Sequence, residues 1–424
     1  MKSSATLDSS PALAPTAGKT SFHEALVFHA LKPFVHGGLL MTLPDGTSRH
    51  LGAPGAEVTA RMQVNDANFF KRCALYGNVG FGESYVEGEW ETDSIKAVIR
   101  WFILNISKTG GSDASSSRIA FVNLLRGFNR VSHLLRPNSV KTSVRNIAEH
   151  YDLGNDFYSL WLDETMTYSC AKFENPSQSL AEAQHAKYEA LCDKLKLTAH
   201  DHVLEIGCGW GGFCVHAAKN HGCRITAVTI SREQFEYATE RVRRDGLSDK
   251  VEILLQDYRL ITGSFDKIVS IEMLEAVGDA YVDGFFKKCG EVLKPEGLLA
   301  FQVITVPDCG YDNLRKDVDW IQKHIFPGSL LLSIARVNQA VNRTSDLFMH
   351  GLEDMGACYS RTLREWHDRF NAKLPEVRAQ GFDERFIRKW NFYLQYCEAA
   401  FASHNISVVQ AVYTRPNNGM LKSL

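Results

Sequence analysis

Apolar and polar residues change their spacing near residue 142 of this chain. Beyond it, short apolar runs of strand length alternate with stretches in which apolar residues recur every three or four positions, as on one face of a helix. We expect strands at 202–206, 224–230, 251–255, 267–271, 298–306 and 407–413, and helices at 181–195, 212–219, 232–244, 281–293 and 386–402. This alternation predicts an α/β fold with a largely parallel sheet and helices on both faces.

The region before residue 106 has a mixed pattern. Residues 35–43 alternate as in a strand, residues 66–75 have helical spacing, and residues 76–90 are rich in glycine and aromatic residues, which is typical of a loop. We therefore divide the chain into a disordered tail at 1–21, a small mixed α+β domain at 22–105, a basic linker at 106–141 and the α/β domain at 142–424.

Composition narrows the class of protein. An apolar content of 45% and a charged content of 23% are those of a soluble globular protein, and the longest apolar runs are too short to span a bilayer. The first twenty residues lack the apolar stretch of a signal peptide. The ten cysteines are scattered and form no C-x-x-C pair, so we expect reduced thiols, no metal site and a cytoplasmic location.

The net charge of −2 hides an uneven distribution. Between residues 95 and 148 the only acid is Asp113, and the basic residues are Lys96, Arg100, Lys108, Arg118, Arg126, Arg130, Arg136, Lys141 and Arg145. Apolar residues interleave with these charges, a pattern that suits an anionic membrane surface. A solvated linker is the alternative interpretation. No nucleic-acid-reading motif accompanies the charge, so we expect no nucleic-acid partner.

A glycine turn follows the strand at 202–206. Gly207, Gly209 and Gly212 form a G-x-G-x-x-G pattern, which fits both dinucleotides and S-adenosylmethionine. A dinucleotide site needs an acid at the tip of the next strand, and residues 228–232 provide none. Glu205 before the turn, and Asp257 with Tyr258 after the third strand, place acids and an aromatic ring around the pocket. These features favour S-adenosylmethionine.

Five motifs in order carry a closer resemblance. They are 149–158 (EHYDLGNDFY), 165–171 (TMTYSCA), the glycine turn, 228–234 (VTISREQ) and 270–278 (SIEMLEAVG). Over about residues 22–415 the chain resembles the cyclopropane-fatty-acyl-phospholipid synthases and mycolic acid cyclopropane synthases. The resemblance implies a Rossmann-like class I methyltransferase with a seven-stranded sheet. It also implies transfer of a methylene group from S-adenosylmethionine to the cis double bond of an unsaturated phospholipid acyl chain, which forms a cyclopropane ring.

The resemblance also assigns site residues. The expected cofactor-binding set is Tyr168, Ser169, Glu205, Gly207, Cys208, Gly209, Thr229, Gln234, Asp257 and Tyr258. A bicarbonate ion, which would take a proton beside the transferred methyl group, is expected to contact Cys170, Glu275, Gln302, the backbone of Ile304, and Tyr359. Cys397 matches a cysteine often designated as the active-site residue, although its apolar helical face predicts a packing role.

Three positions depart from the family pattern. Gln302 stands where a histidine is usual, and Glu272 and Ala276 replace a common glycine and histidine. Glutamine can donate a hydrogen bond but, unlike histidine, cannot change its charge. The final proton-transfer step can therefore differ from that of the family. One alternative is therefore C-methylation of the alkene to a methyl-branched or methylene lipid. An alternative of another class is a catalytically idle protein that binds lipid or S-adenosylmethionine.

The expected partner is an unsaturated phospholipid within a membrane. We expect the chain to associate peripherally with the inner membrane face, where the N-terminal region engages the bilayer. The resemblance also implies a possible homodimer.

Overall fold

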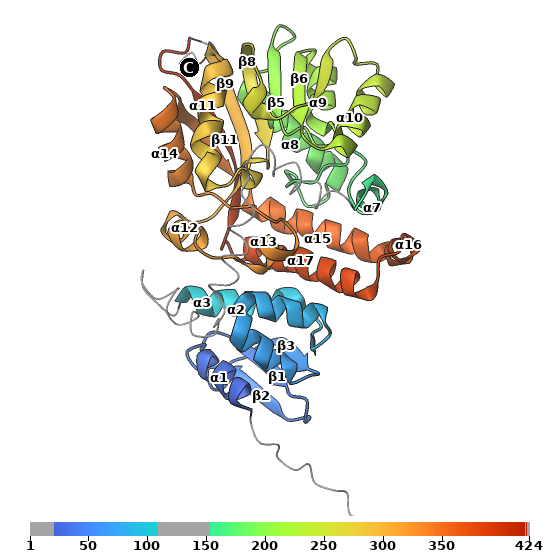
Figure 1. The fold of residues 1–424 in the computed structure, drawn as a ribbon, viewed down its shortest axis with the longest axis vertical. Coiled ribbons are helices and arrows are strands. Elements are labelled where there is room, and N and C mark those ends of the chain that lie inside the picture. Colours follow the sequence, from blue (N-terminus) through green and yellow to red (C-terminus); the bar gives the residue numbers. More distant parts are fainter. Residues whose placement is uncertain (1–20, 109–152, 420, 422–424) are drawn as a thin grey trace, which may run out of the picture.

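The computed structural model describes residues 21–108, 153–419 and 421. A small N-terminal unit, a layer of helices and a large α/β unit follow one another along the long axis of the molecule (Figure 1). The predicted tail at 1–21 and linker at 106–141 lie outside the described residues, apart from Ser21, which caps the first helix, and residues 106–108, which end α3. The predicted domain boundaries therefore remain predictions.

The N-terminal unit combines three helices with a four-stranded sheet. Its strand order is β2-β1-β3-β4, and β1 and β3 are parallel. The elements are α1 (Phe22–Leu31), β1 (Gly38–Thr42), β2 (Ser48–Gly52), β3 (Val58–Val64), α2 (Asn68–Val86), β4 (Trp90–Glu91) and α3 (Ile95–Lys108). The alternating pattern of residues 35–43 thus corresponds to β1.

The expectation of a loop at residues 76–90 is wrong for most of that segment. Helix α2 runs through it to Val86 and is interrupted only at Gly77, where φ is +57°. A Cβ at Gly82 would lie 2.4 Å from the ring of Trp320, so this glycine lets the helix approach a neighbouring side chain closely. Tertiary packing therefore outweighs the low helix propensity of glycine here.

The large unit contains the predicted seven-stranded sheet. Its order is β10-β11-β9-β8-β5-β6-β7; strands β5 to β9 are parallel, and β11 and β10 are antiparallel to their neighbours. The strands are β5 (His202–Ile206), β6 (Arg224–Thr229), β7 (Val251–Leu255), β8 (Phe265–Ile271), β9 (Leu293–Thr305), β10 (Phe348–Asp354) and β11 (Ser407–Thr414). The strand predictions at 202–206, 224–230, 251–255, 267–271, 298–306 and 407–413 are confirmed.

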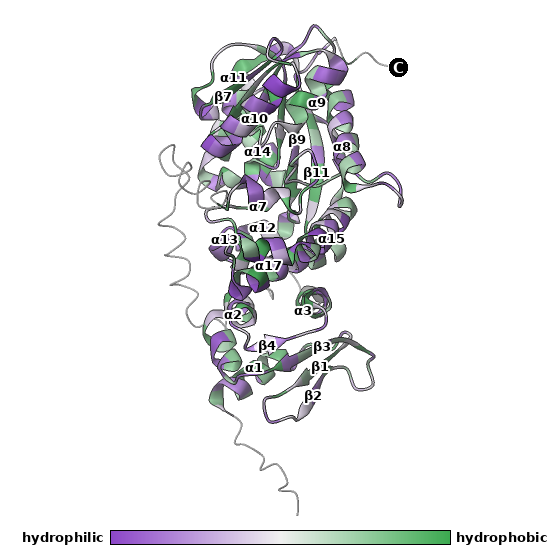
Figure 2. Ribbon diagram, turned by 90° about the vertical axis from the view of Figure 1, so that its right-hand side faces the viewer, coloured by the Kyte–Doolittle hydropathy of each residue, from purple (hydrophilic) through white to green (hydrophobic). Residues whose placement is uncertain are grey.

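Helices cover both faces of this sheet. Helix α8 lies on one side of β9 and β11 and α14 on the other, and the helices differ in how apolar they are (Figure 2). The covering helices are α8 (Leu180–Leu195), α9 (Gly212–His221), α10 (Arg232–Arg244), α11 (Val282–Val292) and α14 (Ile334–Thr344). Helix α8 begins with a capping box, in which Ser179 and Glu182 satisfy each other's backbone N–H groups.

Residues 308–379 contain elements that the periodicity did not predict. Strand β10 lies at the sheet edge and has no buried position, so its sequence lacks the apolar alternation of a half-buried strand. The short helices α12 (Asp308–Leu314), α13 (Trp320–His324) and α16 (Leu374–Ala379), and the long helix α15 (Gly356–Ala372), also lie in this region. A further short helix, α7 (Asn155–Ser159), precedes the α/β unit.

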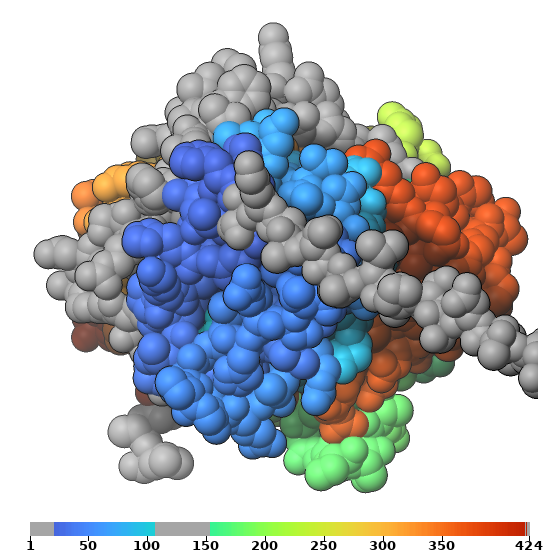
Figure 3. Space-filling view, turned by 90° about the horizontal axis from the view of Figure 1, so that it is seen from below, coloured from blue at the N-terminus to red at the C-terminus, as the bar shows by residue number. Residues whose placement is uncertain are grey.

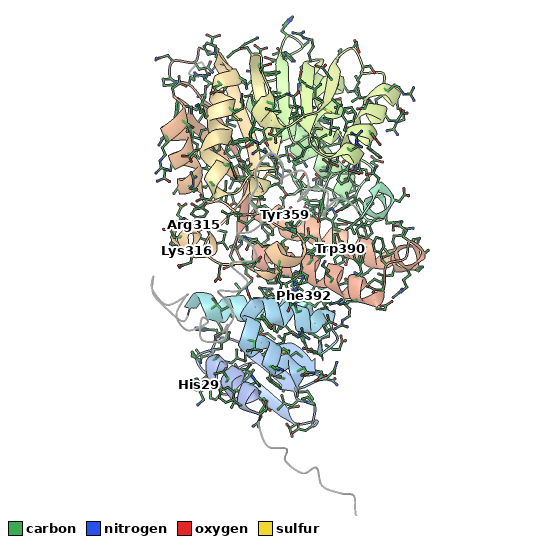
Figure 4. The ribbon with its side chains drawn as sticks, in the orientation of Figure 1. His29, Arg315, Lys316, Tyr359, Trp390 and Phe392 are labelled. Carbon is green, nitrogen blue, oxygen red and sulfur yellow. The ribbon has the colours of Figure 1, made fainter. Side chains whose placement is uncertain are left out.

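The middle layer joins the two outer units through one continuous apolar core. The middle layer consists mainly of α15 and α17 (Glu384–Ala402), which pack on each other. Helix α17 also packs on α2 and α3. Phe392 on α17, labelled in Figure 4, has ring centroids of Trp320 at 4.7 Å and of Tyr85 at 5.6 Å. Viewed from the N-terminal end, the N-terminal unit lies in front, with the helical layer visible beside it (Figure 3).

Polar contacts fix the same junction. Arg388 on α17 donates hydrogen bonds to the carbonyl oxygens of Tyr85 and Trp90. Glu83 on α2 accepts hydrogen bonds from Lys323 at 2.8 Å and His324 at 3.0 Å. Among the described residues, no helix is both long enough and apolar enough to cross a membrane.

The close contact at Gly82 predicts that Gly82→Ala lowers the free energy of unfolding by about 1–3 kcal/mol, because the added methyl group overpacks against Trp320. Gly284→Ala is the matched control. Gly284 is also helical but has open space where a Cβ would lie, so this change should raise stability by about 0.5–1 kcal/mol. Urea unfolding of both variants measures the difference, and a stabilised Gly82→Ala protein would contradict the packing argument.

Candidate active site

A large cavity lies at the carboxyl ends of the parallel strands, between the seven-stranded sheet and the middle helical layer. Its volume is about 920 Å³. Residues at or just after the ends of β5, β6 and β8 line it, as do residues of α15 and α17. Ligands of open α/β sheets bind at this edge.

The glycine turn after β5 forms one wall of the cavity. Gly207 and Gly209 have φ values of +84° and +52°, which a glycine adopts without steric cost. A Cβ at Gly209 would meet no atom within 4 Å and would project into the open space. Gly212 has a different role, because a Cβ there would lie 2.2 Å from the hydroxyl of Tyr188. Gly209 thus leaves the cavity open, Gly207 leaves room for Met273, and Gly212 lets α9 approach α8.

Every residue expected to bind the cofactor lines this cavity. They are Tyr168, Ser169, Glu205, Gly207, Cys208, Gly209, Thr229, Gln234, Asp257 and Tyr258. Thr229 donates a hydrogen bond to Gln234 at 2.9 Å, which holds the end of β6 against the start of α10. Burial alone would raise the pKa of Asp257, but hydrogen bonds from Arg259 keep that pKa below its usual value. Asp257 therefore presents a carboxylate.

Glu205 is a buried carboxyl group with an unsatisfied atom. Its side chain is nearly inaccessible to solvent, and its Oε2 has no hydrogen-bond partner among the described residues. Burial raises its pKa to about 8. An unsatisfied buried acceptor beside the glycine turn fits a ligand that brings hydrogen-bond donors, as the ribose or amino group of S-adenosylmethionine does.

A second carboxyl group, that of Glu272, forms the chemical centre of the opposite wall. Its Oε1 accepts hydrogen bonds from the Cys170 backbone N–H at 2.8 Å and from Gln302 Nε2 at 2.7 Å. Its Oε2 accepts one from the Tyr359 hydroxyl at 2.6 Å. Tyr359 is labelled in Figure 4, where α15 meets the large sheet. Burial raises the pKa of Glu272, and the three donors from separate segments act against that rise by favouring the charged form.

The backbone at Glu272 is unusual. Its φ of +48° lies in the left-handed region, which costs a side-chain-bearing residue about 1–2 kcal/mol. Such strain persists where surrounding contacts hold it, and here the three hydrogen bonds to the carboxylate do so. The sequence analysis noted Glu272 only as a departure from the family pattern, because no sequence signal shows where its side chain points.

Glu275 lies beside Glu272 and makes different contacts. It belongs to a short 3-10 helix (Leu274–Ala276), and its Oε1 accepts a hydrogen bond from the Ile304 backbone N–H at 2.6 Å. Its Oε2 is buried without a partner among the described residues. Burial, followed by the nearby Glu272 carboxylate, raises the pKa of Glu275. Burial also raises the pKa of Glu272, but only Glu272 has three donors that lower it in part, so Glu275 is the member of this pair that favours the proton.

The residues expected to hold bicarbonate do come together, but around these two carboxyl groups. Cys170, Gln302 and Tyr359 donate to Glu272, and Ile304 donates to Glu275. Cys170 and Gln302 are fully buried and lie behind the cavity wall. The remaining oxygen of Gln302 accepts a hydrogen bond from Gln410 at 3.0 Å. The donor groups are thus already used by this chain's own carboxylates, and bicarbonate does not fit among them.

Aromatic rings line the same cavity as Glu272: those of Tyr168, Tyr359, Tyr393 and Phe401. The hydroxyl groups of Tyr168 and Tyr393 lie 2.7 Å apart, and the rings of Tyr359 and Phe401 have centroids 4.4 Å apart. Electron-rich ring faces attract positive charge. This wall of the cavity can therefore stabilise a cationic centre without adding water.

The far part of the cavity is mainly apolar. Side chains from α12, α13 and the neighbouring segments line it, together with α17: Cys309, Leu314, Ile321, Phe326, Leu331, Cys397 and Ala400. Burial raises the pKa of the Cys397 thiol, which leaves it in the protonated form and a weak nucleophile. The position of Cys397 on the apolar wall agrees with the packing role expected for it.

Potential metal ligands lie elsewhere. Glu189, Cys192 and His216 place ligand atoms within 4.8 Å of one another between α8 and α9. His216 is 2.8 Å and His221 is 3.1 Å from the Glu189 carboxylate, which are ordinary hydrogen-bond distances. This group is satisfied by its own contacts, and none of its residues lines the cavity.

Comparison with known proteins places this geometry in context. Residues 138–411 match the family described as mycolic acid cyclopropane synthetase. The chain is 36% identical over 386 residues to tuberculostearic acid methyltransferase UfaA1 of Mycobacterium tuberculosis, covering 88% of this chain and 87% of that protein. It is 37% identical over 357 residues to the cyclopropane-fatty-acyl-phospholipid synthase of Escherichia coli K12, covering 84% and 88%.

A solved structure shares the fold. The mycolic acid cyclopropane synthase CmaA1, complexed with SAH and CTAB, aligns with a TM-score of 0.60 and 28% identity, covering 64% of this chain and 98% of that chain. The expected class I methyltransferase fold, with a seven-stranded sheet and a smaller N-terminal sheet, is confirmed.

The open space at Gly209 predicts that Gly209→Val weakens the binding of S-adenosylhomocysteine at least about tenfold, because the side chain would occupy the cavity. Gly246→Val is the matched control, since Gly246 also has a positive φ and open surroundings but lies on the surface after α10. Isothermal titration calorimetry measures both. Equal affinity in the two variants would place the cofactor elsewhere.

Proposed function

Because this chain belongs to the mycolic acid cyclopropane synthetase family, we propose that it transfers a methylene group to the cis double bond of an unsaturated phospholipid acyl chain and closes a cyclopropane ring. It is an S-adenosylmethionine-dependent methyltransferase, and the family acts on unsaturated acyl chains. The observation that carries the ring-forming step is the Glu272 carboxylate, which lines the cavity and is held by three donors.

S-adenosylmethionine supplies an electrophilic methyl group, which a poorly nucleophilic alkene needs. The glycine turn at Gly207 and Gly209 gives this donor close access to the backbone, and Glu205 offers an unsatisfied acceptor. The wall that contains Glu272 and Tyr359 lines the same cavity as the glycine turn. These residues would orient donor and alkene toward each other, and such alignment accounts for much of the rate of a two-substrate reaction.

The apolar part of the cavity supports an acyl chain as the second ligand. The lining side chains of α12, α13 and α17 are mainly aliphatic or aromatic, and they exclude water from the reacting carbons. Methyl addition leaves one alkene carbon positively charged. The rings of Tyr168, Tyr359, Phe401 and their neighbours would stabilise that charge until a proton is removed.

We propose Glu272 as the base for this proton. It accepts hydrogen bonds from Cys170, Gln302 and Tyr359, three of the residues that the family resemblance assigns to bicarbonate, so a residue of this chain would replace the ion. A proton passes from the new methyl group to a Glu272 oxygen. The electron pair of the broken C–H bond forms the second C–C bond and closes the ring. Burial favours a proton on Glu275, and the three donors favour the ionised form of Glu272, so Glu272 would be the member of the pair that accepts the proton.

A second candidate is C-methylation of the alkene without ring closure. If a hydride shifts first, loss of a proton from the same methyl group gives a methylene lipid, and the same base serves both outcomes. Two observations favour keeping it: the departures from the family pattern at Glu272, Ala276 and Gln302, and the 36% identity to a tuberculostearic acid methyltransferase. A catalytically idle binding protein is disfavoured, because three hydrogen bonds hold Glu272 in a costly backbone conformation at the cavity wall.

We also propose that the chain acts at the inner membrane face, as a peripheral protein and a possible homodimer. Phe22 is 76% and Val35 is 48% exposed on the N-terminal unit, which supports contact of this unit with lipid. The basic stretch expected to attract anionic head groups lies mostly outside the described residues.

The proposal predicts cyclopropane acyl chains in bacteria that make cis-unsaturated phospholipids and express this protein. Fatty acid methyl esters would gain one CH2 group by gas chromatography with mass spectrometry, and proton NMR would show upfield ring signals. Cells carrying the empty vector are the control. Vinyl signals of an exocyclic methylene, in place of ring signals, would favour the second candidate.

The proposed base predicts that Glu272→Gln lowers kcat at least about a hundredfold while leaving S-adenosylhomocysteine affinity within about twofold. Glu272→Gly should be equally inactive, but it leaves a space lined by the Cys170, Gln302 and Tyr359 donors. Added formate or bicarbonate should therefore restore part of its activity, whereas neither should affect the unmodified protein. Glu236→Gln, an exposed change on α10, is the control. An active Glu272→Gln protein would contradict the proposed base.

A further inference from the structure

Lys187 on α8 is a fully buried cation directly behind the proposed catalytic wall. Its side chain has no solvent exposure, and its Nζ donates a hydrogen bond to the Ser169 hydroxyl at 2.8 Å. Among the described residues, no carboxylate oxygen lies within 4 Å of this nitrogen. Burial lowers the pKa of Lys187 to about 8. An ammonium group in such a place is costly, and packing alone does not account for it.

The loop that Lys187 contacts also carries a donor to the base. Ser169 lies between Tyr168, which lines the cavity, and Cys170, whose backbone N–H holds Glu272. Gln184, one turn earlier on α8, donates a hydrogen bond to the Ser169 carbonyl oxygen at 3.0 Å. Helix α8 therefore holds the hydroxyl group and the carbonyl group of Ser169, and so fixes the segment that positions Glu272.

The charges around these groups are unbalanced without Lys187. The groups that act on Lys187 are Glu272, Asp163, Glu205 and the Cys170 thiol. The groups that act on Glu272 are Glu275 on the same loop, Tyr359 on α15, Gln302 on β9, Cys170 and Lys187. Lys187 is the one cation in these two sets of described residues, so its removal would leave the Glu272 carboxylate without a nearby positive charge.

We propose that Lys187 is a positioning residue for proton removal: it anchors the Ser169–Cys170 segment that holds Glu272, and its positive charge keeps Glu272 ionised. This inference rests on the proposed function, since it assumes that Glu272 is the base. Lys187 does not line the cavity and does not touch the reacting atoms. It acts through the loop and through its electric field.

Two substitutions separate anchoring from charge. Lys187→Gln keeps a donor for the Ser169 hydroxyl but removes the positive charge, so the pKa of Glu272 should rise. The acid limb of the kcat–pH profile should then move up by about one pH unit, which is about a tenfold loss of rate on that limb. Lys187→Arg keeps the charge and should leave the limb near its original position. The KM for S-adenosylmethionine should change less than about twofold in either variant.

A measurement without substrate also tests whether Lys187 lowers the pKa of Glu272. At low pH, infrared spectra of the unliganded protein should contain a carboxylic acid band of Glu272, which its loss in Glu272→Gln would identify. In Lys187→Gln this band should persist to higher pH than in the unmodified protein. If Lys187→Gln fails to fold, Lys187→Met provides the same neutral comparison at matched side-chain length.

The outcomes distinguish the positioning role of Lys187 from the proposal that Glu272 is the base. An unshifted acid limb and an unshifted infrared band in a folded neutral variant would overturn the role of Lys187, even if Glu272→Gln is inactive. An active Glu272→Gln protein would instead overturn the proposed base. A shifted limb in Lys187→Gln, restored in Lys187→Arg, supports the proposal.

Discussion

The arrangement of this site depends on the hydrogen bonds that hold the Glu272 carboxylate. A charge in a cavity of low polarity is stable only when donors surround it. Here the donors come from the loop before α8, from β9 and from α15, so a single carboxylate joins a loop, a strand and a helix. It also holds its own backbone in a left-handed conformation. Three segments of the cavity wall and its surroundings are thus joined through this one group.

The middle helical layer is the second constraint, because it must bury apolar faces on two sides. Helix α17 packs on α15 and also on α2 and α3 of the N-terminal unit. Trp320 begins α13, whose next residue, Ile321, lines the cavity, while Trp320 itself packs against Gly82 and Phe392. The N-terminal unit therefore supports the apolar wall of the cavity as well as covering one end of the molecule (Figure 3).

The electrostatics of the cavity rest on a few buried groups in opposite protonation states. Burial raises the pKa of Glu205, Glu275 and Glu272, which favours their neutral forms, but only Glu272 has three donors that counteract this rise. The positive charge of Lys187 lowers the pKa of Glu205 and of Glu272. Two carboxyl groups in one place rarely ionise together, so their environments assign one to hold a proton and the other to accept one.

The sequence by itself determined the features that depend on neighbours along the chain. Alternating apolar runs predicted the parallel strands, and the glycine turn at 207–212 predicted a nucleotide-like cofactor, because strand burial and glycine conformation are local properties. Tertiary structure decided the rest. Residues 76–90 are largely helical because Gly82 packs on Trp320, more than two hundred positions away. The role of Glu272 was equally invisible, since its partners Cys170 and Tyr359 lie far from it in sequence, and only the fold brings their donors to one carboxylate.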